Sequence, residues 1–417
     1  MPLTVTDARI DDAPATIRID DGVIVALGPD VIAEPGDEVL DARGMAAIAG
    51  FVNGHGHAAM TLLRGAGGDL PLRRWLEDVI WPAEAHLTDE DVYWGTRLAA
   101  LEMIRSGTVH FFDMYWQPAA VARAAEDAGL RATVGMPLFD DGDASRLPEV
   151  QRTVVTSLDE LAAFGPLITP SLTPHALYTV SAESLRYVAE VSVEHDLIVH
   201  IHLSETRHEV DEWLAAHGTR PATSADELGL LGPRTILAHG CHLDRGELEL
   251  VAARGATVVT NPVSNMKLAG GDMFPYPLAR DAGVHVGLGT DGAASNNSLD
   301  LLADMKVFAL VQKHTAGDPT VAPAAEVLAL AQGRLSPLLG GRALEVGAPG
   351  DVVLVDTAQH ALNPGPLVDN LVYAASGTVV DTTIVAGRVL MHGGRIEGAD
   401  EVVGRARERA AALTGRS

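Results

Sequence analysis

The 417-residue chain has a single cysteine, Cys241, and only three lysines, all in its second half. One cysteine excludes an intrachain disulfide and a zinc site built from several thiolates. No run of eighteen or more apolar residues occurs, so the sequence predicts no membrane-spanning helix. The N-terminal stretch MPLTVTDARIDD has neither a basic region nor an apolar core, which argues against a signal peptide. These absences predict a soluble, cytoplasmic protein.

Basic residues are scarce overall. The formal net charge is −26 and arginines and lysines form no cluster, which disfavours nucleic acid or an anionic membrane surface as a partner. Hydrophobic residues make up 47% of the chain, enough for a large core. The 42 glycines and 23 prolines are spread along the sequence and mark turns, not a disordered tract. The composition indicates a large globular enzyme or binding protein for small molecules.

Strand-like segments at both ends flank a central α/β region. Residues 1–50 and 346–417 contain short β-like runs, and the second range closes with a helical segment. In residues 51–345, short apolar strands alternate with amphipathic helices, which is typical of a parallel α/β fold. Eight barrel strands are predicted, at residues 46–54, 108–114, 131–137, 167–173, 197–203, 235–240, 256–262 and 284–291. This count predicts a (β/α)₈ TIM barrel with a small β-sandwich domain formed by both termini.

Histidines gather where these strands would end. In FVNGHGHAAMTLLR, His55 and His57 are two residues apart and would point to the same face of a strand. Active-site side chains of a TIM barrel come from the C-terminal ends of its strands. The other polar residues near those ends are His175, His200, His202, His239 and Asp291. Any one of these histidines alone could be structural, but their joint position predicts a metal centre.

Four ligands can be assembled from this set, namely His55, His57, His202 and Asp291. Three imidazoles and one carboxylate suit Zn²⁺, with Fe²⁺ as the alternative, and leave a position for water. Such a metal lowers the pKa of that water towards neutrality and supplies a hydroxide nucleophile. Asp291 can also accept the proton of the attacking water, and His239 can stabilise the developing oxyanion or the leaving group.

Glu205 follows His202 by three residues in the segment HLSET. A carboxylic acid there can protonate a ring nitrogen of a substrate and make the adjacent carbon electrophilic. The alternative is a solvated glutamate at a helix start. Many barrel hydrolases bridge two metals with a carboxylated lysine at the end of strand 4, but no lysine precedes Lys267. The sequence therefore predicts a mononuclear centre.

Longer motifs around these residues resemble one family. They are residues 51–65, 75–96, 101–108, 174–180, 202–206, 261–269 and 288–302. From about residue 45 to 345 the chain resembles the amidohydrolase superfamily, and within it the 5′-methylthioadenosine/S-adenosylhomocysteine deaminases. The resemblance implies the same four metal ligands, proton transfers by Glu205 and His239, and deamination at C6 of a 5′-modified adenosine to the inosine analogue and ammonia.

The resemblance also implies contacts with a nucleoside. Glu84, in WPAEAHL, would hydrogen-bond the ribose hydroxyls, and His175 would touch the nucleoside. Family members that take S-adenosylhomocysteine use two arginines against its amino-acid tail. Arg146 matches one of them, whereas Met136 occupies the other position. Because methionine packs against a thioether but cannot pair with a carboxylate, we expect methylthioadenosine, 5′-deoxyadenosine or a similar neutral 5′ group to be preferred.

Other features bear on alternative functions. Gly54 and Gly56 stand where the family commonly has threonines, which removes bulk beside the metal. For Trp75 and Trp81 core packing is predicted. The alternative function keeps the site and changes the ring to a guanine-like, pterin-like or s-triazine heterocycle, for which Glu84 would have no ribose to bind. A barrel that had lost its metal would show gaps among the ligands, and none occurs. We expect a homodimer or homotetramer.

Overall fold

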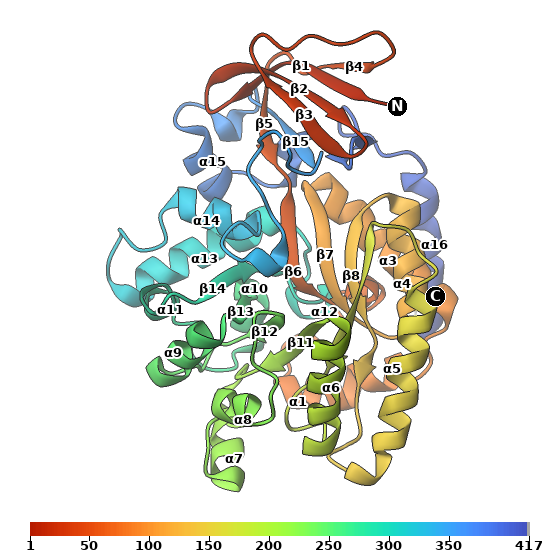
Figure 1. Ribbon diagram of the computed structural model, residues 1–417, viewed down its shortest axis with the longest axis vertical. Helices are drawn as coiled ribbons and strands as arrows, with labels where there is room; N and C mark the ends of the chain where they lie inside the picture. The colour runs from red at the N-terminus through yellow and green to blue at the C-terminus, as the bar shows by residue number, and fades with distance from the viewer. Residues whose placement is uncertain (415–417) are drawn as a thin grey trace.

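The computed structural model describes residues 1–414 and contains a closed barrel with a second sheet above it (Figure 1). Eight parallel strands follow one another around the barrel, and the two-residue β9 (Pro137–Leu138) pairs only with β10. The barrel strands are β6 (Phe51–Gly56), β7 (Thr108–Met114), β8 (Arg131–Gly135), β10 (Ile168–Pro174), β11 (Ile198–Leu203), β12 (Thr235–His239), β13 (Thr257–Thr260) and β14 (His285–Leu288). The predicted TIM barrel is confirmed.

Helices cover the outside of the barrel, so its strands are buried on both faces and read as nearly continuous apolar runs. The first long helix starts at a capping box, in which the Thr88 hydroxyl accepts the Asp91 N–H and the Asp91 carboxylate accepts the Thr88 N–H. The helices are α1 (Leu72–Trp75), α2 (Trp81–Glu84), α3 (Asp89–Arg105), α4 (Pro118–Ala128), α5 (Leu147–Leu161), α6 (Ala182–His195), α7 (Arg207–His217), α8 (Pro221–Glu227), α9 (Arg245–Arg254), α10 (Pro262–Leu268), α11 (Tyr276–Ala282), α12 (Ala293–Asn296), α13 (Leu301–Ala316), α14 (Ala324–Ala331), α15 (Leu367–Tyr373) and α16 (Ala399–Thr414). Within residues 1–414, none of these helices has the length and apolar character needed to cross a membrane.

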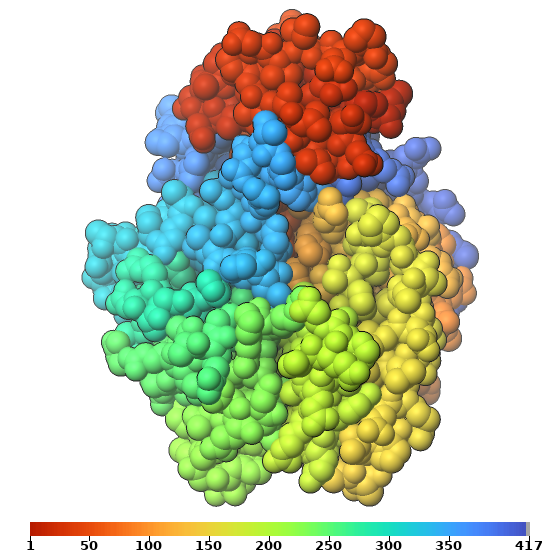
Figure 2. All heavy atoms as spheres, viewed as in Figure 1, coloured from red at the N-terminus to blue at the C-terminus, as the bar shows by residue number. Residues whose placement is uncertain are grey.

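Both termini contribute to the second sheet, which Figure 2 shows as a cap on the barrel. Its strands are β1 (Leu3–Ile10), β2 (Ala13–Asp20), β3 (Val23–Gly28), β4 (Glu38–Asp41), β5 (Met45–Ala49), β15 (Val352–Asp356), β16 (Val380–Val385) and β17 (Arg388–Met391). β5 pairs antiparallel with β15 and thereby joins the two ends of the chain. These strands enclose an apolar core of their own, separate from that of the barrel. Residues 415–417 of the predicted C-terminal region lie outside the described residues.

One predicted strand is divided in the structure. The run 46–54 was expected to form the first barrel strand, but β5 belongs to the terminal sheet and only β6 belongs to the barrel. Gly50 lies between β5 and β6, where the chain passes from one sheet to the other. The backbone is packed closely there, because a Cβ at Gly50 would lie 2.3 Å from a methyl carbon of Val109. An apolar run has the same composition in either sheet, so its sequence does not show where the chain leaves one sheet for the other.

The first and last barrel strands meet through backbone and side-chain hydrogen bonds. The Asp291 N–H donates to the His55 carbonyl at 3.0 Å. The Asn53 side chain accepts the Thr290 N–H at 3.0 Å and donates to the Thr290 hydroxyl at 2.7 Å. A Cβ at Gly289 would lie 2.9 Å from the His55 backbone, so only glycine permits this approach. The closure places Asp291 directly beside His55.

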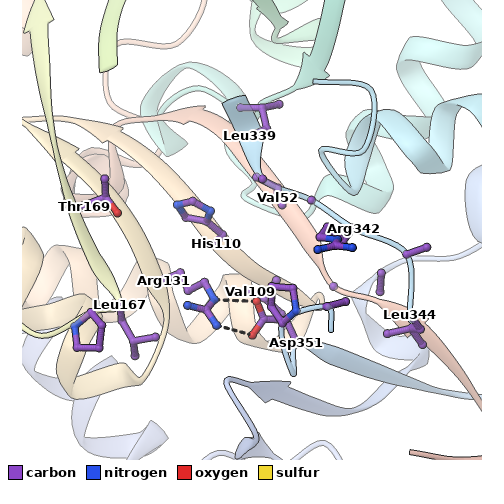
Figure 3. Close-up of a pocket in the computed structure, with 18 residues that line it drawn as sticks. Val52, Val109, His110, Arg131, Leu167, Thr169, Leu339, Arg342, Leu344 and Asp351 are labelled. Atoms are coloured by element: carbon purple, nitrogen blue, oxygen red, sulfur yellow. Dashed lines mark hydrogen bonds and ion pairs between the residues drawn. The ribbon is translucent and has the colours of Figure 1, made fainter. Parts of the chain in front are cut away.

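The terminal sheet is fixed to the N-terminal ends of the barrel strands. Figure 3 shows the Arg131 guanidinium, from β8, forming two hydrogen bonds of 2.7 and 3.2 Å with the Asp351 carboxylate. Asp351 also accepts the Ala386 N–H at 2.7 Å. His110 lines the same hollow, and burial, assisted by the charge of Arg131, lowers its pKa to about 3. The N-terminal end of the barrel is thus occupied by contacts with the terminal sheet. The opposite, C-terminal end is the one at which TIM barrels place their active-site residues.

Candidate functional site

Four side chains converge at the C-terminal ends of the barrel strands. His55 and His57 come from β6 and the residue after it, His202 from β11, and Asp291 from the loop after β14. The Asp291 carboxylate lies 3.2 Å from His57 Nε2 and 3.5 Å from His55 Nε2. His202 Nε2 lies 3.4 Å from His57 Nε2. The four predicted ligands therefore lie in one cluster, in which His55, His57 and Asp291 form one close group and His55, His202 and His239 form another.

Each of these imidazoles is oriented through its other ring nitrogen. His57 Nδ1 lies 2.7 Å from the Met114 carbonyl, and His202 Nδ1 lies 2.8 Å from the His175 carbonyl. A carbonyl only accepts, so each Nδ1 carries a proton, and each Nε2 is turned towards the cluster. His55 Nδ1 lies 2.9 Å from Nε2 of His200, which is itself buried. Such outer partners fix ring orientation in metal sites.

The donor set fits a divalent metal. Among the described residues, His55 Nε2 has no hydrogen-bond partner although it is fully buried, a costly state for a polar atom. Burial favours protonation of Asp291, but the imidazoles of His55 and His57, 3.5 and 3.2 Å from its carboxylate, hold the pKa of Asp291 well below its usual range. An ionised carboxylate and three imidazole lone pairs match the ligand preferences of Zn²⁺ and Fe²⁺. The strand-4 position after β10 is His175, so no lysine can bridge a second metal there.

Two serines hold the other oxygen of Asp291. Asp291 Oδ2 accepts the hydroxyl of Ser264 at 2.6 Å and that of Ser295 at 3.0 Å. The two serines lie in the segments NPVSN and GAASNN, whose polar residues the sequence analysis did not assign to a role. Both serines lie in motifs that follow β13 and β14, at the end of the barrel that holds the histidines. That position could have indicated a role for them in the site. Their hydrogen bonds turn Oδ1 towards the histidines.

Glu205 and His239 face each other beside this cluster. Glu205 Oε2 lies 3.9 Å from His239 Nε2, and His239 Nδ1 lies 2.8 Å from the Asn265 side-chain oxygen. Burial raises the pKa of Glu205, which favours the protonated acid. Ser204, His239 and Asp291 all have left-handed backbones, with φ of +51°, +74° and +61°. Strained non-glycine residues of this kind cluster at active sites.

Glu84, at the end of α2, brings a buried carboxylate to the same cavity. Its Oε2 accepts the indole N–H of Trp116 at 3.2 Å, and the hydroxyl of Tyr115 also faces it. Among the described residues, Glu84 Oε1 is buried without a hydrogen-bond partner. Burial raises the pKa of Glu84 while Tyr115 and Trp116 oppose that rise. One carboxylate oxygen is thus held by the protein and the other is available to a ligand.

His175 belongs to a stack of rings along one wall. Its ring lies 4.4 Å from that of Phe139, and Phe139 lies 5.7 Å from Trp116, both nearly parallel. His175 Nδ1 lies 2.9 Å from the Thr179 hydroxyl. The stack provides a flat apolar surface between Glu84 and the metal-ligand cluster.

A pocket joins these groups. Its lining is mainly aromatic and apolar, and among the described residues that line it there is no arginine or lysine. It is lined by His57, Met60, Leu72, Trp75, Leu76, Ile80, Trp81, Glu84, Met114, Tyr115, Trp116, Pro137, Phe139, His175, Tyr178, His202, Glu205, His239, Leu268, Asp291 and Ser295. At its mouth, Trp81 and Tyr178 also line a larger groove beside α6, α7 and α8.

The structure does not bring Met136 and Arg146 to this pocket. The Arg146 guanidinium lies 2.6 Å from Asp141 and 3.0 Å from Glu149, on the surface. Pro137 and Phe139 line the pocket, and alternation along this extended segment directs Met136, which precedes Pro137, to the other side. Neither Met136 nor Arg146 is therefore among the residues that line this pocket.

The two tryptophans also differ from their predicted roles in part. Trp75 is buried, as core packing requires, and its indole N–H donates to the Ala66 carbonyl at 3.1 Å, but its ring also lines the pocket. Trp81 is 40% exposed at the pocket mouth, so the prediction of core packing was wrong for it. Trp75 and Trp81 lie in short helices, which are too short to show a hydrophobic periodicity. The sequence pattern therefore does not separate a buried tryptophan from one exposed at the pocket mouth.

Comparison with known proteins bears on this site. The profile of the amidohydrolase family matches residues 46–390. A 5′-deoxyadenosine deaminase from Methanoregula boonei is 48% identical over 91% of this chain and 87% of its own length. A 5-methylthioadenosine/S-adenosylhomocysteine deaminase from Archaeoglobus fulgidus is 44% identical over 91% of each chain.

Solved structures give the same picture at the level of the fold. An adenosine deaminase from Xanthomonas campestris with bound zinc superimposes with a TM-score of 0.90 at 31% identity, covering 99% of this chain and 98% of that one. An atrazine chlorohydrolase from Arthrobacter aurescens, complexed with zinc, has a TM-score of 0.89 over 98% of this chain and all of its own. At 22% identity the second likeness shows the fold alone.

Proposed function

Because the chain belongs to the amidohydrolase family, we propose that it is a metal-dependent aminohydrolase that replaces the C6 amino group of a 5′-modified adenosine, giving the inosine analogue and ammonia. The observation that carries the nucleoside assignment is the buried, unpartnered Oε1 of Glu84, which a base without ribose would leave unsatisfied. The deaminase relatives support the reaction type.

We assign His55, His57, His202 and Asp291 as the ligands of one divalent metal, Zn²⁺ first and Fe²⁺ second. The support is their convergence and the unpartnered His55 Nε2. When bound, the metal supplies Lewis acidity that activates water near neutral pH. The cytoplasmic location and the homodimer or homotetramer stay predictions.

Proton transfers fall to three side chains. Glu205 delivers a proton to the ring nitrogen next to C6, since burial favours its protonated form. Asp291 accepts a proton from the attacking water and passes it to the leaving amino group, which departs as ammonia. His239, held by Asn265, donates to the oxygen as the water adds to C6. The proton left on the new hydroxyl returns to Glu205, so the acid is restored.

Glu84 and His175 would position the nucleoside. Glu84→Gln is expected to lower kcat/KM for adenosine substrates about 10- to 100-fold, mainly through KM, because a charge-assisted hydrogen bond to a hydroxyl is weakened. Glutamine retains the size of the side chain, so the pocket keeps its shape. Steady-state ammonia release measures the effect.

The control for Glu84→Gln is a substrate without the ribose hydroxyls that Glu84 would bind. A 2′,3′-dideoxyadenosine derivative lacks both hydroxyls, so the wild type should turn it over poorly and the substitution should cost little more. An equal further loss with the dideoxy substrate would show that Glu84 acts on something other than the ribose.

The 5′ group is tested by a panel containing methylthioadenosine, 5′-deoxyadenosine, adenosine, S-adenosylhomocysteine, guanine, cytosine and an s-triazine. We expect kcat/KM for the first two to exceed that for S-adenosylhomocysteine by about 10-fold or more. Met136 and Arg146 are not among the residues that line the pocket. The expectation now rests on the absence of arginine and lysine from the described pocket lining, which leaves the carboxylate of the amino-acid tail unpaired.

Each other result of the panel has a defined meaning. Equal or faster turnover of S-adenosylhomocysteine would show that its tail reaches a partner in the adjoining groove. Preference for guanine, cytosine or an s-triazine would replace the nucleoside proposal by the alternative function.

A further inference from the structure

We propose that Glu209 is a positioning residue for Glu205, because its carboxylate holds the turn of residues 204–206 that directs Glu205 into the pocket. The inference rests on the proposed function in so far as Glu205 is taken as the acid. Glu209 itself lies in the first turn of α7 and is not among the residues that line the active-site pocket.

The carboxylate of Glu209 binds three successive backbone N–H groups. Its Oε1 accepts the Ser204 N–H at 2.8 Å, and its Oε2 accepts those of Glu205 at 2.7 Å and Thr206 at 3.4 Å. The Thr206 hydroxyl returns a bond by accepting the Glu209 N–H at 3.1 Å. A capping box requires only the exchange between Thr206 and Glu209. The bonds to Ser204 and Glu205 lie beyond what the helix start needs.

Two other capping boxes in the described part of the chain provide a comparison. In α3, the Asp91 carboxylate accepts no backbone N–H beyond that of Thr88. In α9, Glu247 accepts the N–H of its N-cap, Asp244, and otherwise bonds to groups on another helix. Of the three, only the carboxylate of Glu209 binds the two residues that precede its N-cap.

The direction of Glu205 explains why this turn needs support. β11 points His202 into the pocket, and alternation along a continued strand would place Glu205 on the opposite face. The left-handed backbone of Ser204, with φ of +51°, breaks that alternation, so Glu205 lines the pocket together with His202. A buried serine adopts this conformation only where surrounding contacts impose it. Glu209 supplies those contacts.

The surroundings of Glu209 disfavour its charged form. Its pKa is raised to about 7, first by burial and then by the nearby Glu205, while the three N–H groups oppose the rise. A carboxylate that is buried beside a second carboxyl group is unfavourable unless hydrogen bonds offset its desolvation and the repulsion between the two groups. Tyr178 and Cys241 also lie near both carboxylates, and their pKa values are raised chiefly by burial and then by Glu205 and Glu209. His239 lies 3.9 Å from Glu205 on the pocket side.

The primary test is Glu209→Gln. Glutamine is the same size but presents an NH₂ group to backbone donors, so the turn loosens. We expect kcat to fall about 10- to 100-fold, the range typical of outer residues that orient a functional group, with KM and metal content within about two-fold. Glu212→Gln is the matched control, since Glu212 is exposed on the same helix and pairs with His208 at 3.3 Å. It should leave kcat unchanged.

A double-mutant cycle separates positioning from general destabilisation. In a Glu205→Gln background, Glu209→Gln should cost less than about two-fold, because residues that act as one unit are non-additive. The full single-mutant loss in that background would overturn the proposal. So would a normal kcat in Glu209→Gln. If this variant does not fold, Glu209→Asp carries the same expectation, since a chain one methylene shorter cannot reach all three N–H groups.

A readout without activity completes the test. Amide hydrogen exchange at Ser204, Glu205 and Thr206 should accelerate in Glu209→Gln and stay unchanged in Glu212→Gln, and unchanged protection would contradict the clamp. Failure of the proposed function is a separate result, namely a wild-type protein that releases ammonia from no adenosine derivative while the exchange at these amides still depends on Glu209.

Discussion

Glu205→Gln is expected to lower kcat by about 10²- to 10⁴-fold, the range that a positioned general acid contributes. Glutamine fills the same space but cannot deliver a proton to the ring nitrogen. Burial raises the pKa of Glu205, so the native side chain is suited to act as an acid. His239, 3.9 Å away, is already held by Asn265 and does not replace it. Steady-state ammonia release with methylthioadenosine measures the loss.

Metal content separates this chemical effect from damage to the site. Glu205 is not one of the four assigned ligands, so the variant should keep one equivalent of metal, measured by elemental analysis. Glu249→Gln, at an exposed position of α9, serves as the neutral control and should retain full activity. Near-normal turnover by Glu205→Gln would remove Glu205 from the mechanism.

The barrel was predictable because its signal is local. Each strand is a short apolar run between helical segments, and β7 coincides with the predicted range 108–114. The run 46–54 was misassigned because strand pairing is decided by residues far away in sequence, here Val352–Asp356, which pairs with β5. Pattern alone separates strands from helices, but not one sheet from another.

Convergence of His55, His57, His202 and Asp291 also followed from pattern, since strand ends in a parallel barrel meet at one rim. The residues that orient these four side chains could not be predicted from the pattern. Ser264 and Ser295 were visible only as polar residues in motifs, because their bonds to Asp291 depend on which turn of a helix faces the rim. Thr206 and Glu209 have the T-x-x-E spacing of a capping box, but that spacing does not show the two additional N–H partners of Glu209.

The 5′ pocket shows the limit of carrying positions over from a family resemblance. Arg146 matched a position of the family in sequence, yet its guanidinium is already paired with Asp141 and Glu149. Met136 occupies the expected position, but strand alternation assigns the pocket face to Pro137 and Phe139. A matching residue type therefore indicates a role only when its side chain also points to the ligand.

Removal of the metal by a chelator is expected to abolish activity, and one equivalent of Zn²⁺ per chain should restore it. The reason is that three imidazoles and one ionised carboxylate lie in one cluster, while the strand-4 position that could bridge a second metal is His175. Activity should rise linearly with added Zn²⁺ and level off at one equivalent. Two equivalents, each required for turnover, would contradict the mononuclear site.

Thermal stability tests the same ligands independently of catalysis. A ligand that binds only the folded state stabilises it by about 2.7 kcal/mol at a free concentration 100 times Kd. Zn²⁺ should therefore raise the Tm of the metal-free wild type and of the control His195→Ala, whose histidine is exposed on α6. His55→Ala should lose most of that increase, because it deletes the buried Nε2 that has no other partner among the described residues. An undiminished increase in His55→Ala would place the metal elsewhere and would withdraw the assignment of all four ligands.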